Sequence, residues 1–144
     1  MKGKTPRVRG LKEAVSLCIS KKAEDVVILD MRKLSSFTEY FVIASGESTV
    51  QTRAIANAIE EKLKKKDVKV YHSEGREGGR WILLDAGRFI VHLFLKEARE
   101  FYNLELLWAD TPRVEINSFS PSGLHPRKGR GAGKVVRGYG KTAT

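Results

Sequence analysis

Two aspartates are the residues best placed to do metal chemistry. Asp30 and Asp85 each end an apolar run of strand length, where a nucleotide-transferring enzyme would place carboxylates that bind Mg²⁺. Two carboxylates at alternating positions of a strand point to one face and can share a metal ion. Neither aspartate has such a partner, because Arg32 and Gly87 stand two residues further on. The sequence therefore predicts no metal ion, no cofactor and no nucleotide transfer.

The histidines and the cysteine do not form a site either. His72, His92 and His125 lack the short, regular spacing of zinc ligands. Cys18 is the only cysteine and falls on the apolar side of an expected helix, where a cysteine usually acts as a small hydrophobe. The absence of a disulfide framework favours a reducing compartment.

Two glycine-containing segments could bind phosphate, and for both we favour a structural role. The glycines between residues 75 and 79 lie in a short charged loop and do not lead from a strand into a helix, as a dinucleotide-binding motif would. Residues 45–48 precede a helix whose free amides could hold an anion. The same glycine and serines are needed for the turn and the helix cap, so we interpret them in that way.

The elements that would carry these side chains alternate between helix and strand. Ser48 followed by Gln51 has the spacing of a capping box, and apolar residues then recur every four positions at Ile55, Ile59 and Leu63. Helices are expected at 10–21, after Ser48 and at 97–108, and strands at 25–31, 40–45, 68–72, 81–84 and 89–95. This order predicts an α/β fold: one domain with a mixed β-sheet and helices packed on one face.

The charge is distributed unevenly along the chain. The formal net charge is +10, yet residues 11–112 hold sixteen basic and sixteen acidic side chains. All the excess lies in a basic N-terminal arm, residues 1–10, and a basic, glycine-rich C-terminal tail, residues 113–144. We expect the folded domain to span residues 11–112. No apolar run approaches the ~18 residues of a membrane span and no signal peptide is visible, which predicts a cytoplasmic protein.

The C-terminal tail has too few apolar residues to repay the entropy of ordering, so we expect it to be disordered in isolation. Its cations suit loose contact with RNA phosphates, in which released counterions provide affinity without sequence reading. A purely solubilising tail explains the composition equally well. The candidate RNA contacts are Arg127, Lys128, Arg130, Lys134 and Arg137.

The expected hairpin at 81–95 is apolar on both of its faces. Alternation places Ile82, Leu84, Phe89, Val91, Leu93 and Leu95 on one side and Trp81, Leu83, Ile90, His92 and Phe94 on the other. Helices are expected to cover the first side. The second side is then an exposed apolar patch of the kind that marks a protein interface. The alternative is that the first helix or a crossing loop covers it and makes Trp81 a core residue.

Several motifs together resemble one known family. The segments SSFTEYFVIASG at 35–46, RWILLDAGRFIVHLF at 80–94 and REFYNLELLW at 99–108 are similar, in order and spacing, to the ribosomal silencing factor family (RsfS, also called Iojap-related). The similarity covers residues 11–112 and leaves the basic tail outside. Arg88 stands where the family usually has an acid, Glu39 replaces a commoner Asp, and Val50 and Gln51 occupy the place of a basic pair.

The resemblance implies a nucleotidyltransferase-like fold without that superfamily's activity. It also implies a function: binding of the fourteenth protein of the large ribosomal subunit, so that the small subunit cannot join and translation is repressed. With this family in view we favour the interface reading of the second face. The residues expected to bind the partner are Trp81, Leu83, Asp85, Ile90, His92, Phe94 and Lys96. The same patch is a candidate for homodimer contact in the free protein.

Three classes of function are compared. A ribosome-docking repressor requires one protein partner and no turnover. A divergent nucleotidyltransferase requires a metal site that these residues do not form. A general RNA-binding module requires basic residues on the folded part, which is neutral in sum. We therefore predict a ribosome-docking repressor that is not an enzyme.

Overall fold

The structure is a computed structural model that describes residues 6–102, 106 and 109–116. It contains the predicted elements in the predicted order. They are α1 (Leu11–Ser20), β1 (Glu24–Asp30), β2 (Tyr40–Gly46), α2 (Thr49–Lys65), β3 (His72–Glu74), β4 (Trp81–Asp85), β5 (Phe89–Leu95) and α3 (Lys96–Tyr102). The single α/β domain expected from the sequence is confirmed.

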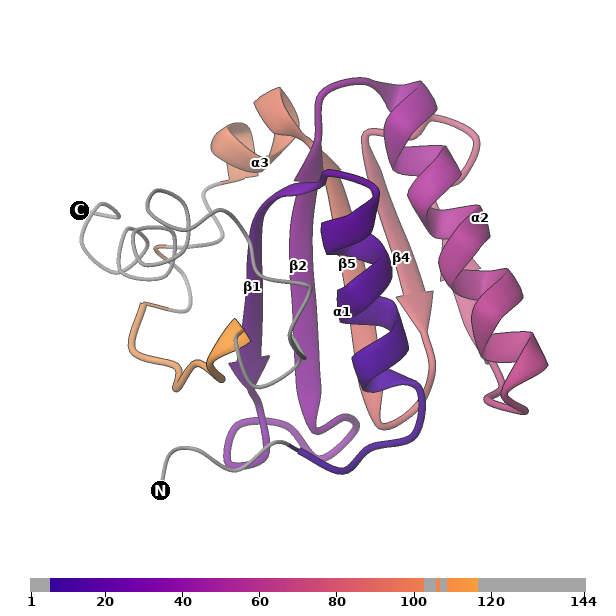
Figure 1. Cartoon of the computed structure of the whole chain (residues 1–144). Helices are drawn as coiled ribbons and strands as arrows, with labels where there is room; N and C mark the ends of the chain where they lie inside the picture. The colour runs from indigo at the N-terminus through magenta and orange to yellow at the C-terminus, as the bar shows by residue number, and fades with distance from the viewer. Residues whose placement is uncertain (1–5, 103–105, 107–108, 117–144) are drawn as a thin grey trace.

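The strands form one mixed sheet in the order β1-β2-β5-β4-β3. β2 and β5 run parallel at its centre, with Tyr40 opposite Phe89, and every other pair is antiparallel. The long connection from β2 to β5 contains α2, which crosses the sheet beside α1 (Figure 1). The hairpin expected around residues 85–88 is confirmed as the β4–β5 pair.

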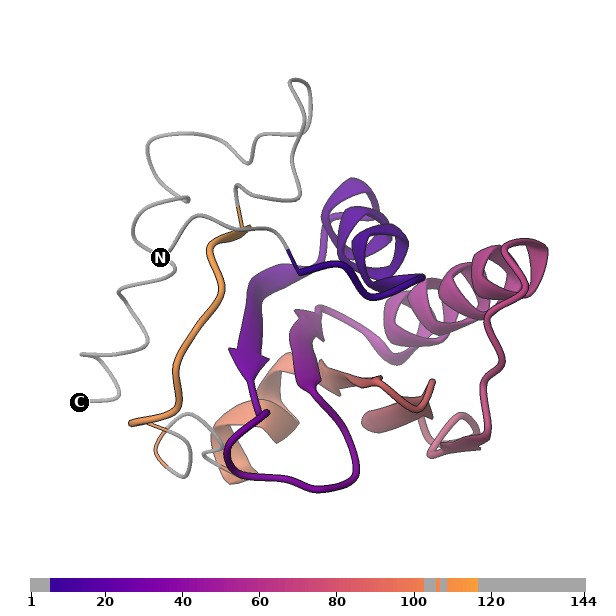
Figure 2. The same ribbon diagram turned by 90° about the horizontal axis from the view of Figure 1, so that it is seen from below.

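Two helices cover one face of the sheet, and the third lies on the other. α1 and α2 pack side by side on the same face, whereas α3 turns back beneath the opposite face after β5 (Figure 2). The expectation that all helices share one face is therefore wrong for α3. α3 follows β5 without a loop, and its Ala98 enters an apolar cluster on the second face.

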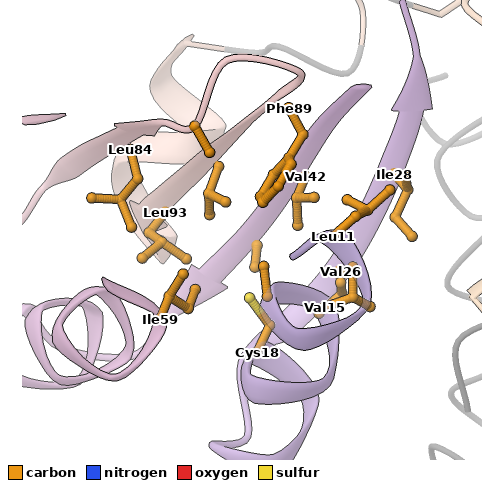
Figure 3. Close-up of a cluster of buried hydrophobic side chains, with 14 of the residues drawn as sticks. Leu11, Val15, Cys18, Val26, Ile28, Val42, Ile59, Leu84, Phe89 and Leu93 are labelled. Carbon is orange, nitrogen blue, oxygen red and sulfur yellow. The ribbon is translucent and has the colours of Figure 1, made fainter. Parts of the chain in front are cut away.

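The main core fills the space between the sheet and the helices α1 and α2. Leu11, Val15 and Cys18 of α1 and Ile59 of α2 meet the inward side chains of the strands (Figure 3). Phe89 is the largest of the fully buried side chains in this core. Cys18 is a buried free thiol, as predicted, and burial raises its pKa to about 12. It therefore serves as a small apolar side chain.

The start of α2 is fixed by the predicted capping residues. The Ser48 hydroxyl accepts a hydrogen bond from the backbone N–H of Gln51 at 3.1 Å, which satisfies one of the free amides of the first turn. The Gln51 side chain accepts from the N–H of Glu47 and donates to the carbonyl groups of Lys21 and Lys22. Gln51 thus joins the β2–α2 turn to the end of α1.

The third strand lies further along the chain than expected. The prediction was 68–72, but β3 begins at His72. The N–H of Val68 is bound to the carbonyl oxygen of Leu63 at 2.8 Å, so it completes the end of α2 and cannot pair with a strand. After β3, Gly75 has a φ of +81°, and a Cβ there would lie 2.0 Å from the carbonyl oxygen of Trp81. This close approach requires glycine.

The described ends of the chain take part in packing. Val8, within the expected N-terminal arm, and Ile116, within the expected tail, are both buried in the main core. Residues 112–114 run along the outer edge of β1. The N–H of Asp30 donates to the carbonyl oxygen of Pro112, and the N–H of Val114 donates to the carbonyl oxygen of Ile28. Among the described residues, no helix combines the length and the apolar character that a membrane span requires.

Candidate functional site

Trp81 stands at the start of β4 on the face opposite α1 and α2. Its ring is half-buried, and its centroid lies 4.9 Å from the ring of Phe94 and 4.9 Å from that of Tyr102. Phe94 is the strand partner of Trp81 on β5, and Tyr102 comes from α3. Strand pairing and the return of α3 therefore hold the indole in place while part of it remains exposed.

A hydrogen bond also orients Trp81. Its Nε1 donates to Nδ1 of His92 at 3.2 Å, and the ring of Phe41 meets the imidazole edge-on at 4.7 Å. His92 is buried, and burial lowers its pKa from 6.5 to about 4. The imidazole is therefore neutral near pH 7, and its Nδ1 accepts the hydrogen bond from the indole N–H.

The exposed part of this face is smaller than the alternation pattern predicted. Phe94 is fully buried and His92 nearly so, whereas Trp81, Leu83 and Ile90 are half-buried. The expectation that a phenyl and an imidazole are exposed is therefore wrong. α3 covers that end of the face, which the sequence pattern of the hairpin alone could not show.

The covered part forms a second, smaller apolar cluster. It consists of Val27, Leu29, Met31, Ile43, Phe94 and Ala98, with Phe41, Trp81 and Leu95 packed against it. Leu95 therefore packs on this side, and the expectation from alternation that it faces the main core is wrong. Its backbone N–H donates to the carbonyl oxygen of Arg80, and α3 begins at the next residue.

α3 adds exposed apolar surface beside Trp81. Phe101 is 76% exposed and Tyr102 is also exposed, as is Leu106 beyond the end of α3. Tyr102 packs one side of its ring against Trp81 although it is 45% exposed. The remaining residues of the expected helix, at 103–105 and 107–108, lie outside the described residues.

Arg99 fastens α3 to the sheet and was not identified from the sequence. It is buried, and its NH1 donates to the carbonyl oxygen of Asp25 and to the Ser45 hydroxyl, both at 2.8 Å. Asp25 lies where the β1–β2 register shifts and has a positive φ of 49°. An arginine on a helix after a strand gives no signal of this role in the sequence.

Two charged candidates stand at the rim of the face. Asp85 is half-buried at the end of β4, and its Oδ1 accepts the N–H of Gly87 at 2.8 Å. Lys96 is exposed at the start of α3, and its Nζ lies 3.3 Å from Oε1 of Glu24. The Glu24 carboxylate, together with Glu47, raises the pKa of Lys96. The structure thus places a carboxylate and an ammonium group near opposite ends of the β4–β5 pair.

The carboxylates considered for metal chemistry have other partners. The NH2 group of Arg32 lies 2.7 Å from Oδ2 of Asp30, and this hydrogen bond lowers the pKa of the Asp30 carboxyl. His72 pairs with Glu74 at 2.7 Å on the exposed strand β3. Within the described part of the chain, no three His, Cys, Asp or Glu residues are grouped as metal ligands would be. His125 and the five tail cations lie outside the described residues.

Comparison with known proteins assigns the chain to a family. The model of the family described as "Ribosomal silencing factor during starvation", RsfS, matches residues 5–134. The chain belongs to the RsfS family. The matched range includes part of the basic arm and most of the tail, beyond the residues that carry the motifs. Membership places the chain among ribosome-related regulators of translation.

Individual relatives agree with this RsfS assignment. The chain is 40% identical to "Ribosomal silencing factor RsfS" of Bacillus subtilis over 107 residues, which cover 74% of this chain and 91% of that protein. It is 34% identical to "Mitochondrial assembly of ribosomal large subunit protein 1" of Mus musculus, covering 65% of this chain and 42% of the mouse protein. A crystal structure of a Bacillus halodurans protein matches with a TM-score of 0.66 and 40% identity, covering 73% and 95% of the two chains.

Glu39 and Arg88 contact each other across the end of the sheet. The guanidinium of Arg88, after the β4–β5 turn, forms two hydrogen bonds of 3.1 Å with the carboxylate of Glu39. The Glu39 carboxylate raises the pKa of Arg88. Glu39 and Arg88 therefore form one ion pair that joins the turn to the start of β2.

Proposed function

We propose that this RsfS protein binds the large ribosomal subunit through its fourteenth protein, keeps the small subunit from joining, and thereby represses translation in the cytoplasm. It acts by binding and has no turnover. Family membership supports a ribosomal target, and the name of the mouse relative refers to the large subunit. The identity of the partner protein follows from the resemblance to the family.

The observation that carries the proposal is the position of Trp81. A large, partly exposed indole is braced by Phe94, His92 and Tyr102, so little side-chain freedom remains to be lost on binding. Tryptophan is among the residues that most often supply the binding energy of an interface. Trp81 is therefore the proposed anchor.

The neighbours of Trp81 complete a contact surface. Leu83 and Ile90 provide half-buried apolar area on the same face, while Asp85 and Lys96 provide charged groups at its edge. His92 and Phe94 support the anchor from below. In the free protein the same surface is the proposed contact for a second copy, which ribosome binding would displace.

The test compares Trp81→Ala with Val50→Ala in the full chain. Val50 is an exposed apolar residue of α2, on the opposite side of the sheet, and serves as the matched control. We expect Trp81→Ala to weaken cosedimentation with the large subunit by about 2 kcal/mol or more, and Val50→Ala to have no effect.

Circular dichroism separates docking from folding. If Trp81→Ala unfolds the protein, Leu83→Ala takes its place, since that side chain belongs to neither apolar cluster. Full subunit binding by a folded Trp81→Ala or Leu83→Ala variant contradicts the proposed site. Binding that survives without the fourteenth ribosomal protein contradicts the proposed partner.

A further inference from the structure

A groove of about 750 Å³ lies at the end of the sheet opposite the start of β4. Its walls come from the segment before α1, the β1–β2 loop, the segment after α2 and the β4–β5 turn. In Figure 1 these segments meet at the lower end of the sheet, away from α3. Trp81 and Asp85 are four residues apart on β4, roughly 13 Å at the usual strand rise, so the groove is separate from the Trp81 surface.

The groove is positively charged although residues 11–112 are neutral in sum, partly because two of its cations come from the basic arm at 1–10. Five cations line it, namely Arg7, Arg9, Arg32, Lys69 and Arg88, against two carboxylates, Glu39 and Asp67. Arg32 and Arg88 are already paired with Asp30 and Glu39. Arg7, Arg9 and Lys69 are exposed and have no carboxylate partner among the described residues. These three cations, of which Asp67 can offset one, carry the positive excess of the groove.

Two exposed aromatic rings accompany these cations. Phe37, in the β1–β2 loop, is 88% exposed, and Tyr71, in the segment before β3, is 63% exposed. The ammonium of Lys69 lies 5.0 Å from the centroid of the Tyr71 ring, and Gly87 leaves room for the edge of that ring. Tyr71 is thus held in place by its neighbours. The Phe37 side chain is left with a free ring face that a flat ligand could cover.

We propose that this groove binds a short stretch of single-stranded RNA, with phosphates at Arg7, Arg9 and Lys69 and a base stacked on Phe37. A cationic groove that follows a backbone, combined with aromatic rings that accept bases, is the usual design of single-strand binding sites. Guanidinium groups match phosphate oxygens in geometry as well as charge.

Other ligands fit these observations less well. A free phosphate would leave Phe37 unused, and an acidic peptide would not provide a succession of flat rings. Only the choice of RNA over DNA rests on the proposed ribosomal function. The proposal extends that function by giving the folded domain an RNA contact that does not depend on the C-terminal tail.

The experiment measures fluorescence anisotropy of a labelled oligouridylate of about eight nucleotides, within the usual size range of such sites, with the full-length protein over a salt series. For single-stranded nucleic acids, the logarithm of the binding constant falls with the logarithm of the salt concentration, and each phosphate contact contributes about 0.7 to the size of that slope. We expect the double variant Arg7→Glu, Lys69→Glu to flatten the slope by about 1.4. The double variant Lys21→Glu, Lys22→Glu, an equal charge change just after the end of α1, is the control and should leave the slope unchanged.

Phe37→Ala separates the groove from general attraction to basic segments. Because it removes a stacking surface and no charge, it should weaken RNA binding about tenfold and leave the salt slope unchanged. Phe37 is exposed, so the fold should survive. Photocrosslinking with 4-thiouridine RNA should label the tryptic peptide 34–53, which contains Phe37.

The outcomes are distinct for the two proposals. Unchanged affinity in Phe37→Ala, or crosslinks confined to peptides beyond residue 116, would falsify the RNA groove and leave the Trp81 docking site untouched. Conversely, Trp81→Ala should not alter oligouridylate binding. If Trp81→Ala keeps full subunit binding while Phe37→Ala loses RNA, the docking proposal fails and the groove stands.

Discussion

The indole N–H of Trp81 donates a 3.2 Å hydrogen bond to Nδ1 of His92 on the neighbouring strand. Because tryptophan can only donate, Nδ1 is the acceptor and the neutral imidazole carries its proton on Nε2. Nε2 is buried and has no hydrogen-bond partner among the described residues. The residue that orients the proposed anchor therefore keeps this role only while it is uncharged.

Acid should destabilise the protein through His92. Burial lowers the folded-state pKa to about 4 from the ordinary 6.5, so between these values the unfolded chain binds a proton that the folded chain does not. The stabilising contribution is complete above pH 6.5 and is lost as the pH falls towards 4. The change amounts to about 3 kcal/mol of the free energy of unfolding.

Urea denaturation across this pH range measures the effect. The control is His92→Gln, whose side-chain oxygen can still accept from Trp81 but does not titrate. Its stability should vary less with pH over the same interval. Parallel curves for the two proteins would show that His92 is not the group responsible.

Two glycines of the β3–β4 loop provide a matched pair. Gly75→Ala forces a side chain into positive φ and against the carbonyl oxygen of Trp81, whereas Gly78 has no other atom within 4 Å of an added Cβ. We expect Gly75→Ala to lower the free energy of unfolding by at least about 2 kcal/mol. Gly78→Ala should be neutral or slightly stabilising. Equal thermal stability of the two variants would contradict the close approach of Gly75 to β4.

Removing Arg99 should release α3. Its buried guanidinium bonds to Asp25 and Ser45, and a hydrogen bond to a charged group contributes about 1.5 to 3 kcal/mol. Arg99→Ala should therefore cost at least about 2 kcal/mol in chemical denaturation. It should also weaken ribosome binding, because Tyr102 would no longer support Trp81. Ser45→Ala removes a single bond and should have a smaller effect on both measurements.

No nucleotide transfer is expected with Mg²⁺ or Mn²⁺ and any of the four NTPs. Asp30 is occupied by Arg32, and Asp85 accepts the N–H of Gly87, so neither is arranged with a second carboxylate around a metal. Transfer from labelled NTPs to RNA or protein acceptors is the assay. Turnover that disappears in Asp85→Asn would overturn this prediction.

Deleting residues 117–144 should weaken binding to the large subunit at low salt and flatten its salt dependence. The deleted segment carries Arg127, Lys128, Arg130, Lys134 and Arg137, whose contact with ribosomal RNA would be independent of sequence. Binding to the isolated fourteenth protein should not change. Equal affinities of the full-length and truncated proteins across a salt titration would mean that the tail does not contact the ribosome.

The elements with strong local signals were predictable from the sequence. The capping residues of α2 and the apolar runs of β1, β2 and β5 placed these elements correctly, because their periodicity matches their burial. β3 was misplaced, since its three residues are all exposed and carry no apolar pattern. The depth of His92 and Phe94 depends on the direction that α3 takes after Leu95. That direction is fixed by the long-range bonds of Arg99, which leave no periodic signal.

The pairing of residues 112–114 along β1 has a consequence for solubility. A bare outer strand offers unpaired N–H and C=O groups to another chain, and this is a common route to aggregation. Here one margin of the sheet is occupied by the chain itself, and the other, β3, is short and carries His72 and Glu74. Strand-by-strand growth is thus disfavoured at both margins. A partner therefore has to bind on a face of the sheet. A truncation before Pro112 would expose the edge of β1 and favour insoluble material, whatever its effect on ribosome binding.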